Sequence, residues 1–198
     1  MKRGIAVSTA AAAVLLLTAF AGSAQACSSF GAQRVFAPWG DQRAYLLAPD
    51  GGYEAGAVGW NLSGGAKVVA GNESSYLHGA GDHSSLSLPA GSSAGSPPIC
   101  MAIDTPVFRM MARNSGDPSS RLRVTATYSL LGILRTKTVG TVSAGSAWVP
   151  TDPQSTVLTL STVIGTLIPS AIQIRLNPLD SIGRWQVDDL YVDPFSRR

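Results

Sequence analysis

Apolar and polar positions alternate along many short stretches of this sequence, and residues 121–128 give the clearest case. Alternation with a period of two places one set of side chains on each face of a β-strand. The apolar set is Leu122, Val124, Ala126 and Tyr128, and the polar set is Arg121, Arg123, Thr125 and Thr127. The pattern predicts a strand in an antiparallel sheet, with one face in the core and the other in solvent.

Similar short runs continue to the end of the sequence and are separated by turn signals such as Asn114-Ser-Gly-Asp-Pro118. The runs cover 44–48, 57–62, 66–70, 84–88, 99–103, 106–113, 134–142, 158–161, 172–176 and 185–193. Ser63-Gly-Gly65 separates two of them and predicts a hairpin. Little of the sequence after residue 26 favours helix. Strands of this length and spacing indicate an all-β domain, either a two-sheet sandwich or a barrel.

The final strand, Trp185 to Pro194, carries the most unusual side chains. Alternation places Asp188, Leu190 and Val192 on a core face, and Val187, Asp189 and Tyr191 on the other. Trp185 falls on the face opposite Leu190, so the pattern allows its side chain to be exposed to solvent. A carboxylate on a core face is costly unless it is neutralised, hydrogen-bonded or bound to a metal. Glu54 lies in a second unusual stretch, Pro49 to Trp60, and is a candidate companion for Asp188.

The first 26 residues have the pattern of a secretory signal peptide: a basic start, an apolar stretch and a Ser23-Ala-Gln-Ala26 cleavage pattern. We expect residues 27–44 to form an N-terminal extension and residues 45–198 to form one domain. The leader is too short for a membrane anchor, and no later apolar run is long enough for a transmembrane segment. We therefore expect an exported, extracellular protein.

Cys27 and Cys100 are the two cysteines of the sequence. An even number of cysteines in an exported chain favours a disulfide between them. The alternative is a lipid-bearing Cys27 that anchors a lipoprotein, but Ala24 and Gln25 match that signal poorly.

Without Lys2 and Arg3 of the leader, the 15 basic residues fall to 13, against 12 acidic ones. The mature chain is therefore close to neutral. It also has no basic run with interleaved aromatics, so we expect no nucleic-acid partner.

Two motifs carry a family resemblance. The segment Gly51-Gly-Tyr-Glu-Ala-Gly-Ala-Val-Gly-Trp60 resembles the opening of jelly-roll carbohydrate-binding modules, which are galactose-binding-like domains, and Trp185-Gln-Val-Asp-Asp-Leu-Tyr-Val192 resembles their closing strand. The resemblance implies a jelly-roll β-sandwich of two antiparallel sheets. It also implies a structural calcium ion held by Glu54 and Asp188, with backbone carbonyls near Asp50 and Gly52. Calcium prefers such oxygen ligands. The alternative is an Asp188 that accepts backbone N–H bonds without a metal.

The resemblance implies a non-catalytic module that binds a polysaccharide or a cell-surface glycan. The alternative is an extracellular structural or protein-interaction domain. No pair among the four tryptophans predicts a sugar platform, so the ligand-binding residues stay unassigned. A small hydrolase is the weakest hypothesis, because Gly91-Ser-Ser-Ala-Gly95 lacks the strand-then-helix context of a nucleophile motif. We therefore expect no enzyme activity.

Overall fold

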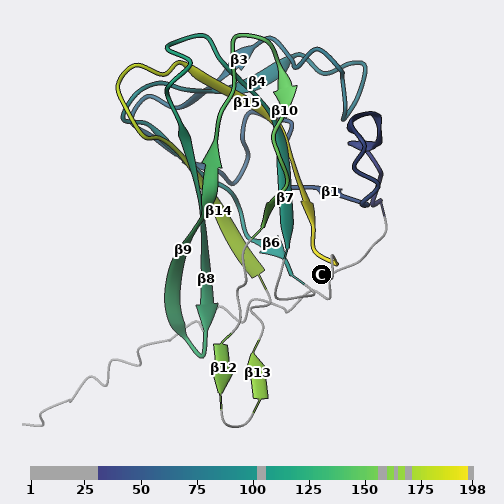
Figure 1. Cartoon of the computed structure of the whole chain (residues 1–198), viewed down its shortest axis with the longest axis vertical. Coiled ribbons are helices and arrows are strands. Elements are labelled where there is room, and N and C mark those ends of the chain that lie inside the picture. The colour runs from purple at the N-terminus through teal and green to yellow at the C-terminus, as the bar shows by residue number, and fades with distance from the viewer. Residues whose placement is uncertain (1–30, 102–105, 156–159, 163–164, 168–170, 196–198) are drawn as a thin grey trace, which may run out of the picture.

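The computed structural model describes residues 31–101, 106–155, 160–162, 165–167 and 171–195. Two antiparallel sheets face each other as a jelly-roll β-sandwich (Figure 1). The first sheet contains β10 (Val149–Pro150), β7 (Val107–Asn114), β15 (Trp185–Asp193), β4 (Ser84–Leu88) and β3 (Lys67–Ala70), with β1 (Leu46–Leu47) beside β15 and β11 (Gln154–Ser155) beside β7. The second sheet contains β2 (Asn61–Ser63), β5 (Ser93–Gly95), β14 (Ala171–Pro178), β8 (Leu122–Leu130) and β9 (Ile133–Val142), with β6 (Ile99–Cys100) beside β14.

Two smaller elements complete the described structure. The strands β12 (Leu160–Thr162) and β13 (Gly165–Leu167) form a separate hairpin at the lower end of the view in Figure 1. A short 3-10 helix, η1 (Ala37–Trp39), precedes the first strand. Within the described residues, no helix is long and apolar enough to cross a membrane.

The main core lies between the two sheets, as the alternating pattern predicts. Leu122, Val124 and Ala126 of β8 are buried there, and Arg123 on the opposite face is exposed. Tyr128 is half-buried and packs against the same core. Thr125 is an exception on the polar face, because it is buried where the β8–β9 register shifts. The all-β prediction and the sandwich prediction are confirmed.

A second core covers the outer face of the first sheet. Phe36 and Tyr45, from the segment before β1, pack with Val107 and Met111 of β7 and with Tyr191 of β15. The ring of Phe36 meets those of Tyr45 and Tyr191 edge-on, with centroids 5.1 and 5.8 Å apart. The described part of the predicted N-terminal extension is therefore packed against the sheet.

The predicted hairpin around Ser63-Gly-Gly65 is wrong. β2 pairs with β5 in the second sheet, whereas β3 pairs with β4 in the first. The two glycines, Gly64 and Gly65, have φ of 62° and 88°, and a Cβ at Gly64 would collide with the carbonyl oxygen of Gly91. The glycines therefore let the chain cross from one sheet to the other, close to a neighbouring loop.

β15 lies inside the first sheet and departs from simple alternation. Asp188 pairs with Met111 and Tyr191 pairs with Arg109, so two residues of β15 oppose one residue of β7. This β-bulge contains Asp189, whose φ is 50°. A bulge of this kind reverses the facing of the side chains beyond it.

The predicted division of faces along β15 holds from Leu190 onward, where Leu190 and Val192 face the main core and Tyr191 faces the second core, and it is wrong before the bulge. Val187 lies in the main core together with Leu190 and Val192, on the two sides of the bulge. Trp185 is buried in the same core, not exposed, and its indole N–H donates to Ser120 Oγ at 3.0 Å.

Candidate functional site

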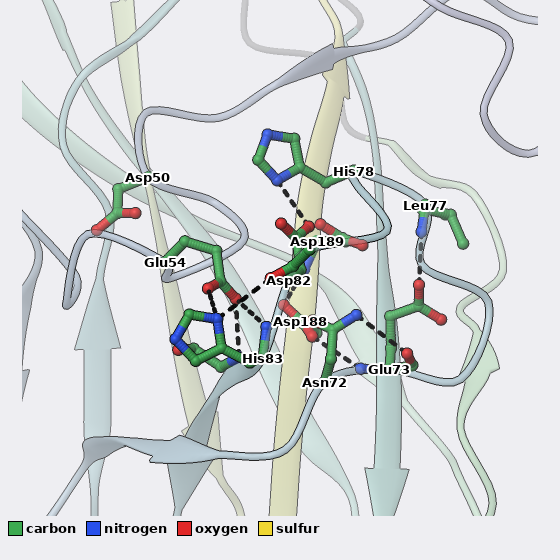
Figure 2. A network of polar contacts seen from close by, with 12 residues as sticks. Asp50, Glu54, Asn72, Glu73, Leu77, His78, Asp82, His83, Asp188 and Asp189 are labelled. Atoms are coloured by element: carbon green, nitrogen blue, oxygen red, sulfur yellow. Dashed lines mark hydrogen bonds and ion pairs between the residues drawn. The ribbon is translucent and has the colours of Figure 1, made fainter.

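The bulge in β15 lies where the neighbouring strand of β15 changes. β4 pairs with β15 over 185–187, and β1 pairs with it at 191–192. Between these two ladders, the turn that follows β1 forms the hydrogen bonds to β15. Leu190 N–H donates to Gly51 O at 3.0 Å, and Ala48 N–H donates to Leu190 O at 2.8 Å. A Cβ at Gly51 would lie 2.7 Å from Leu190 O, so this close approach requires glycine. Acidic and histidine side chains from β15, the 50–54 turn and the 72–83 loop gather at this place (Figure 2).

Asp188 is fully buried and held by backbone N–H groups. One carboxylate oxygen accepts from Glu73 N at 3.0 Å, and the other accepts from Asp189 N at 2.9 Å. Burial raises the pKa of Asp188 to about 8, the negative charge of Asp189 adds to this, and the two N–H groups act in the opposite direction. These contacts match the alternative in which Asp188 accepts backbone N–H bonds.

Asp189 is also buried, but neither of its carboxylate oxygens has a hydrogen-bond partner of normal geometry among the described residues. Burial raises the pKa of Asp189 to about 7, with a further contribution from the charge of Glu73, and the nearby His78 acts in the opposite direction. An unpartnered buried carboxylate is costly and calls for a physical explanation.

The carboxylate of Asp189 lies beside His78 and Asp82. One ligand atom from each of the three residues lies within 4.8 Å of the other two. His78 Nδ1 and Asp82 Oδ2 are 2.8 Å apart, as Figure 2 shows by a dashed line. Gly52 borders the same space, since a Cβ there would lie 3.2 Å from Asp189 Oδ1 and 3.3 Å from His78 Nδ1.

Glu73 is buried next to this cluster and shapes the loop. Its carboxylate accepts from Leu77 N at 2.6 Å and from Ser75 N at 2.5 Å, while its own N–H reaches Asp188. The side chain therefore stabilises the segment that leads to His78.

The structure brings the two predicted calcium segments together but gives each predicted side chain other partners. Glu54 Oε1 accepts from His83 N at 2.9 Å and from Ser84 N at 2.7 Å, and Glu54 Oε2 lies 2.8 Å from His83 Nδ1. Asp50 accepts from the backbone N–H groups of Ala55 and Val58. Calcium at Asp50, Gly52, Glu54 and Asp188 stays a prediction.

Sequence reasoning missed Glu73, His78 and Asp82 as members of this cluster. The spacing of His78 and Asp82, four residues apart in a glycine-rich loop, was the available signal. Their approach to Asp189 depends on the bulge in β15, and the sequence pattern does not predict that bulge.

An open cavity of about 670 Å³ lies at a second place, between η1 and the chain after β10. Its wall includes Trp39, Gln42, Arg43, Arg109 and Asp152. Trp39 is 41% exposed. This cavity therefore combines an accessible indole with charged and amide side chains.

Asp41 holds the charged groups of this cavity in place. Its Oδ2 accepts from Tyr45 OH at 2.8 Å and from Arg109 NH1 at 3.0 Å, and its Oδ1 accepts from Arg43 N and NH1, both at 3.1 Å. Burial acts to raise the pKa of Asp41, but these hydrogen bonds outweigh it and the pKa is lowered. Arg109 also donates to Thr151 O at 2.8 Å, which fixes its guanidinium.

The hydrolase-like motif forms part of a sheet. Ser93 begins β5, and its hydroxyl contacts Ser63 Oγ at 3.1 Å and Arg175 NH1 at 3.4 Å. The segment continues from β5 into β6. The strand-then-helix arrangement of a nucleophile motif is therefore not formed here.

Cys27 and the leader lie outside the described residues, so the disulfide, the lipid alternative and the signal peptide stay predictions. Cys100 is half-buried at the end of β6.

No protein-family model matches this sequence. No curated protein matches it either. Solved structures do match in fold. The CBM22-1 and GH10 modules of Clostridium thermocellum endo-1,4-β-D-xylanase 10B, solved with xylohexaose, match with a TM-score of 0.50 and 12% identity, over 71% of this chain and 27% of that one.

The N-terminal tandem of two family 22 carbohydrate-binding modules from Paenibacillus barcinonensis matches with a TM-score of 0.51 and 14% identity, over 76% of this chain and 44% of that one. The enzymatically active domain of tailspike protein 4 from bacteriophage CBA120 also matches, with a TM-score of 0.51 and 14% identity, over 74% of this chain and 21% of that one. This chain therefore spans less than half the length of each. At these identities the likeness is one of fold, and the fold is that of jelly-roll carbohydrate-binding-module-like domains.

Proposed function

We propose that the protein is an exported, non-catalytic module that binds a polysaccharide or a cell-surface glycan at the cavity beside Trp39. The observation that carries the proposal is an exposed indole next to fixed polar groups in an open cavity. A pyranose ring has an apolar face that packs on an aromatic ring, and hydroxyls that need hydrogen-bond partners. Trp39 supplies the first kind of contact, and the exposed side chains of Gln42, Arg43 and Asp152 supply the second.

The buried Asp41–Arg109 pair supports the proposal because it makes the cavity rigid. The two side chains are each 6% exposed, and the Arg109 guanidinium stacks 4.4 Å from the centre of the Phe36 ring. A site whose polar groups are already fixed loses less conformational entropy when a ligand binds. Arg43 is tied to the same carboxylate while its own side chain stays 46% exposed, so it can still contact a sugar hydroxyl.

Glycan-array binding of the mature protein, followed by calorimetry on the best glycan, tests the proposal. Trp39→Ala should weaken binding about tenfold or more, because loss of an aromatic contact surface costs roughly 1.5 kcal/mol. Tyr76→Ala is the matched control, since Tyr76 is an exposed aromatic outside the cavity wall. Equal binding by wild type and Trp39→Ala would place the sugar elsewhere.

The second candidate function is a protein-interaction domain. It is favoured by the outward face of β8 and β14, where Arg123, Gln173 and Arg175 are exposed and polar. A correctly folded mature protein that binds no glycan on the array would favour this function over the first.

We also propose that calcium stabilises the fold through Glu54 and Asp188, with carbonyls near Asp50 and Gly52. The contact between the 50–54 turn and β15 supports this, and so does the burial of the Asp188 carboxyl group. Calcium that binds only the folded state should raise the melting temperature, and a chelator should reverse the rise. Asp188→Ala should abolish this rise in melting temperature. A wild-type melting temperature that does not change with calcium would refute the calcium site.

A further inference from the structure

We propose that His78, Asp82 and Asp189 form a site for a divalent transition-metal ion of the zinc class, with one coordination position open to solvent. Its three side chains differ from the proposed calcium ligands Glu54 and Asp188, although Gly52 borders both sites, and it does not depend on glycan binding.

The first observation is the state of Asp189. The residue is 1% exposed, and its backbone is held at a φ of 50° in the bulge. Neither carboxylate oxygen has a hydrogen-bond partner of normal geometry among the described residues, and the backbone N–H of His78 is the group that comes nearest to being one. A non-glycine residue in the left-handed region is uncommon, and such residues persist where the surrounding structure imposes them. The bulge therefore fixes an otherwise unsatisfied carboxylate in one direction. A bound cation would satisfy it.

The second observation is that two further potential metal ligands lie beside the Asp189 carboxylate. His78 Nδ1 and a carboxylate oxygen of Asp82 lie within 4.8 Å of an Asp189 oxygen and of each other. Zinc bonds to imidazole nitrogen and carboxylate oxygen at about 2.0–2.2 Å, so neighbouring ligand atoms of a tetrahedral site are about 3.3 Å apart. The three ligand atoms lie within 4.8 Å of one another, so side-chain rotation would have to close the longer separations to reach that spacing.

The donor set favours the zinc class over calcium. Calcium takes six to eight oxygen ligands, whereas imidazole suits zinc and similar transition ions. His78 Nδ1 and Asp82 Oδ2 lie 2.8 Å apart. A ligating imidazole must be neutral and present its lone pair, so a metal ion would take the place of this direct contact.

The surroundings leave room for an ion and for one further ligand. Gly52 lies over the cluster, and a methyl group at that position would come within 3.2 Å of Asp189 Oδ1 and 3.3 Å of His78 Nδ1. The side chains of His78 and Asp82 are 42% and 11% exposed, so the site faces solvent on their side. Three protein ligands with an open position are typical of zinc sites that hold water or a ligand group.

Titration calorimetry of the chelator-treated, dialysed protein with zinc chloride alone tests the site. We expect one equivalent of Zn²⁺ to bind, and Co²⁺ to give the visible absorption of a low-symmetry, tetrahedral-type site. Asp189→Asn and His78→Ala should each lower zinc affinity by more than the roughly 10–100-fold that loss of an outer partner costs. His83→Ala is the matched control, because His83 lies in the same loop, its side chain is 79% exposed and it pairs with Glu54 instead. Its zinc affinity should stay at the wild-type value.

Gly52→Ala gives an independent test that leaves all three ligands in place. It should weaken zinc binding because the added methyl group occupies the space between Asp189 and His78. Circular dichroism and the melting temperature in chelator establish that each variant is folded. Zinc binding that survives His78→Ala, or that is lost equally in His83→Ala, would overturn the proposal. A rise in melting temperature with calcium that is lost in Asp189→Asn, in a protein that binds no zinc, would also overturn the proposal.

Discussion

Lowering the pH from about 8 to about 5 should stabilise the metal-free protein, and the Asp189→Asn variant should remove much of that effect. Asp188 and Asp189 are adjacent, buried carboxylates whose pKa values are raised to about 8 and about 7. In the unfolded chain both groups titrate near their ordinary value of about 3.9. Between these values the folded state holds protons that the unfolded state has lost. Stability therefore falls as pH rises through this window.

The size of the effect follows from the shift at Asp189. A shift of about three units corresponds to about 4 kcal/mol, at 1.36 kcal/mol per unit. Asp188 and Asp189 interact and titrate as a pair, so their contributions do not simply add. At about pH 8, Asp189→Asn should therefore be more stable than wild type by up to about 4 kcal/mol. At about pH 5 the difference should shrink to about 1.5 kcal/mol, because folded Asp189 is then protonated while most of the unfolded chain is still ionised at this position.

Urea unfolding in the presence of chelator, followed by tryptophan fluorescence, measures this difference. The comparison between wild type and variant at each pH isolates Asp189 from other titrating groups. Asp41 acts with the opposite sign, since its pKa is lowered, but its contribution is lost only as pH falls below about 4. Metal-free wild type that is more stable at pH 8 than at pH 5, or a variant with no gain at pH 8, would contradict the buried-charge argument.

Three further predictions concern the fold. Val124→Asp should abolish folding, because it buries an unpaired charge between the sheets, whereas Arg123→Asp on the exposed side of the same strand should change stability by less than about 0.5 kcal/mol in urea unfolding. Trp185→Ala should cost about 3–5 kcal/mol by the same measurement, since the indole is fully enclosed, and a smaller loss would show that its surroundings collapse onto the gap. Cys27 and Cys100 should be joined by a disulfide bond when the protein is made in an oxidising compartment, and the intact mass before and after reduction measures this. Two free thiols or a lipid on Cys27 would refute the bond.

The parts of the fold that follow strict alternation were predictable from the sequence. In β8, Val124 faces the core and Arg123 faces solvent, because a two-residue period leaves no other arrangement for a half-buried strand. The resemblance of the two end motifs to jelly-roll modules gave the architecture. β1 does pair with β15, with Leu46 opposite Val192, so the early and late segments of the domain meet as expected.

The candidate sites were less predictable, because they depend on a local break in that period. The bulge at Asp189 moves Val187 and Leu190 to one face, and no residue type in the segment marks the extra position. The partners of Asp189 come from a loop that is more than a hundred residues earlier in the sequence. The Trp39 cavity depends likewise on how the segment before β1 packs over the first sheet, which is long-range packing that periodicity does not encode.

The position of β15 has a consequence for the order of folding. This strand lies between β7 on one side and β4 and β1 on the other, so the first sheet has no continuous ladder until residues 185–193 have been synthesised. Earlier parts of the chain can form local pairs such as β3–β4 and β8–β9, but β1 must wait for β15, a partner distant in sequence. Pairings of such high contact order are slow, because loop closure is completed before the contacts are gained. The chain therefore cannot complete its sandwich until residues 185–193 have been synthesised, so β7 on one side and β4 and β1 on the other stay without their shared central strand until then.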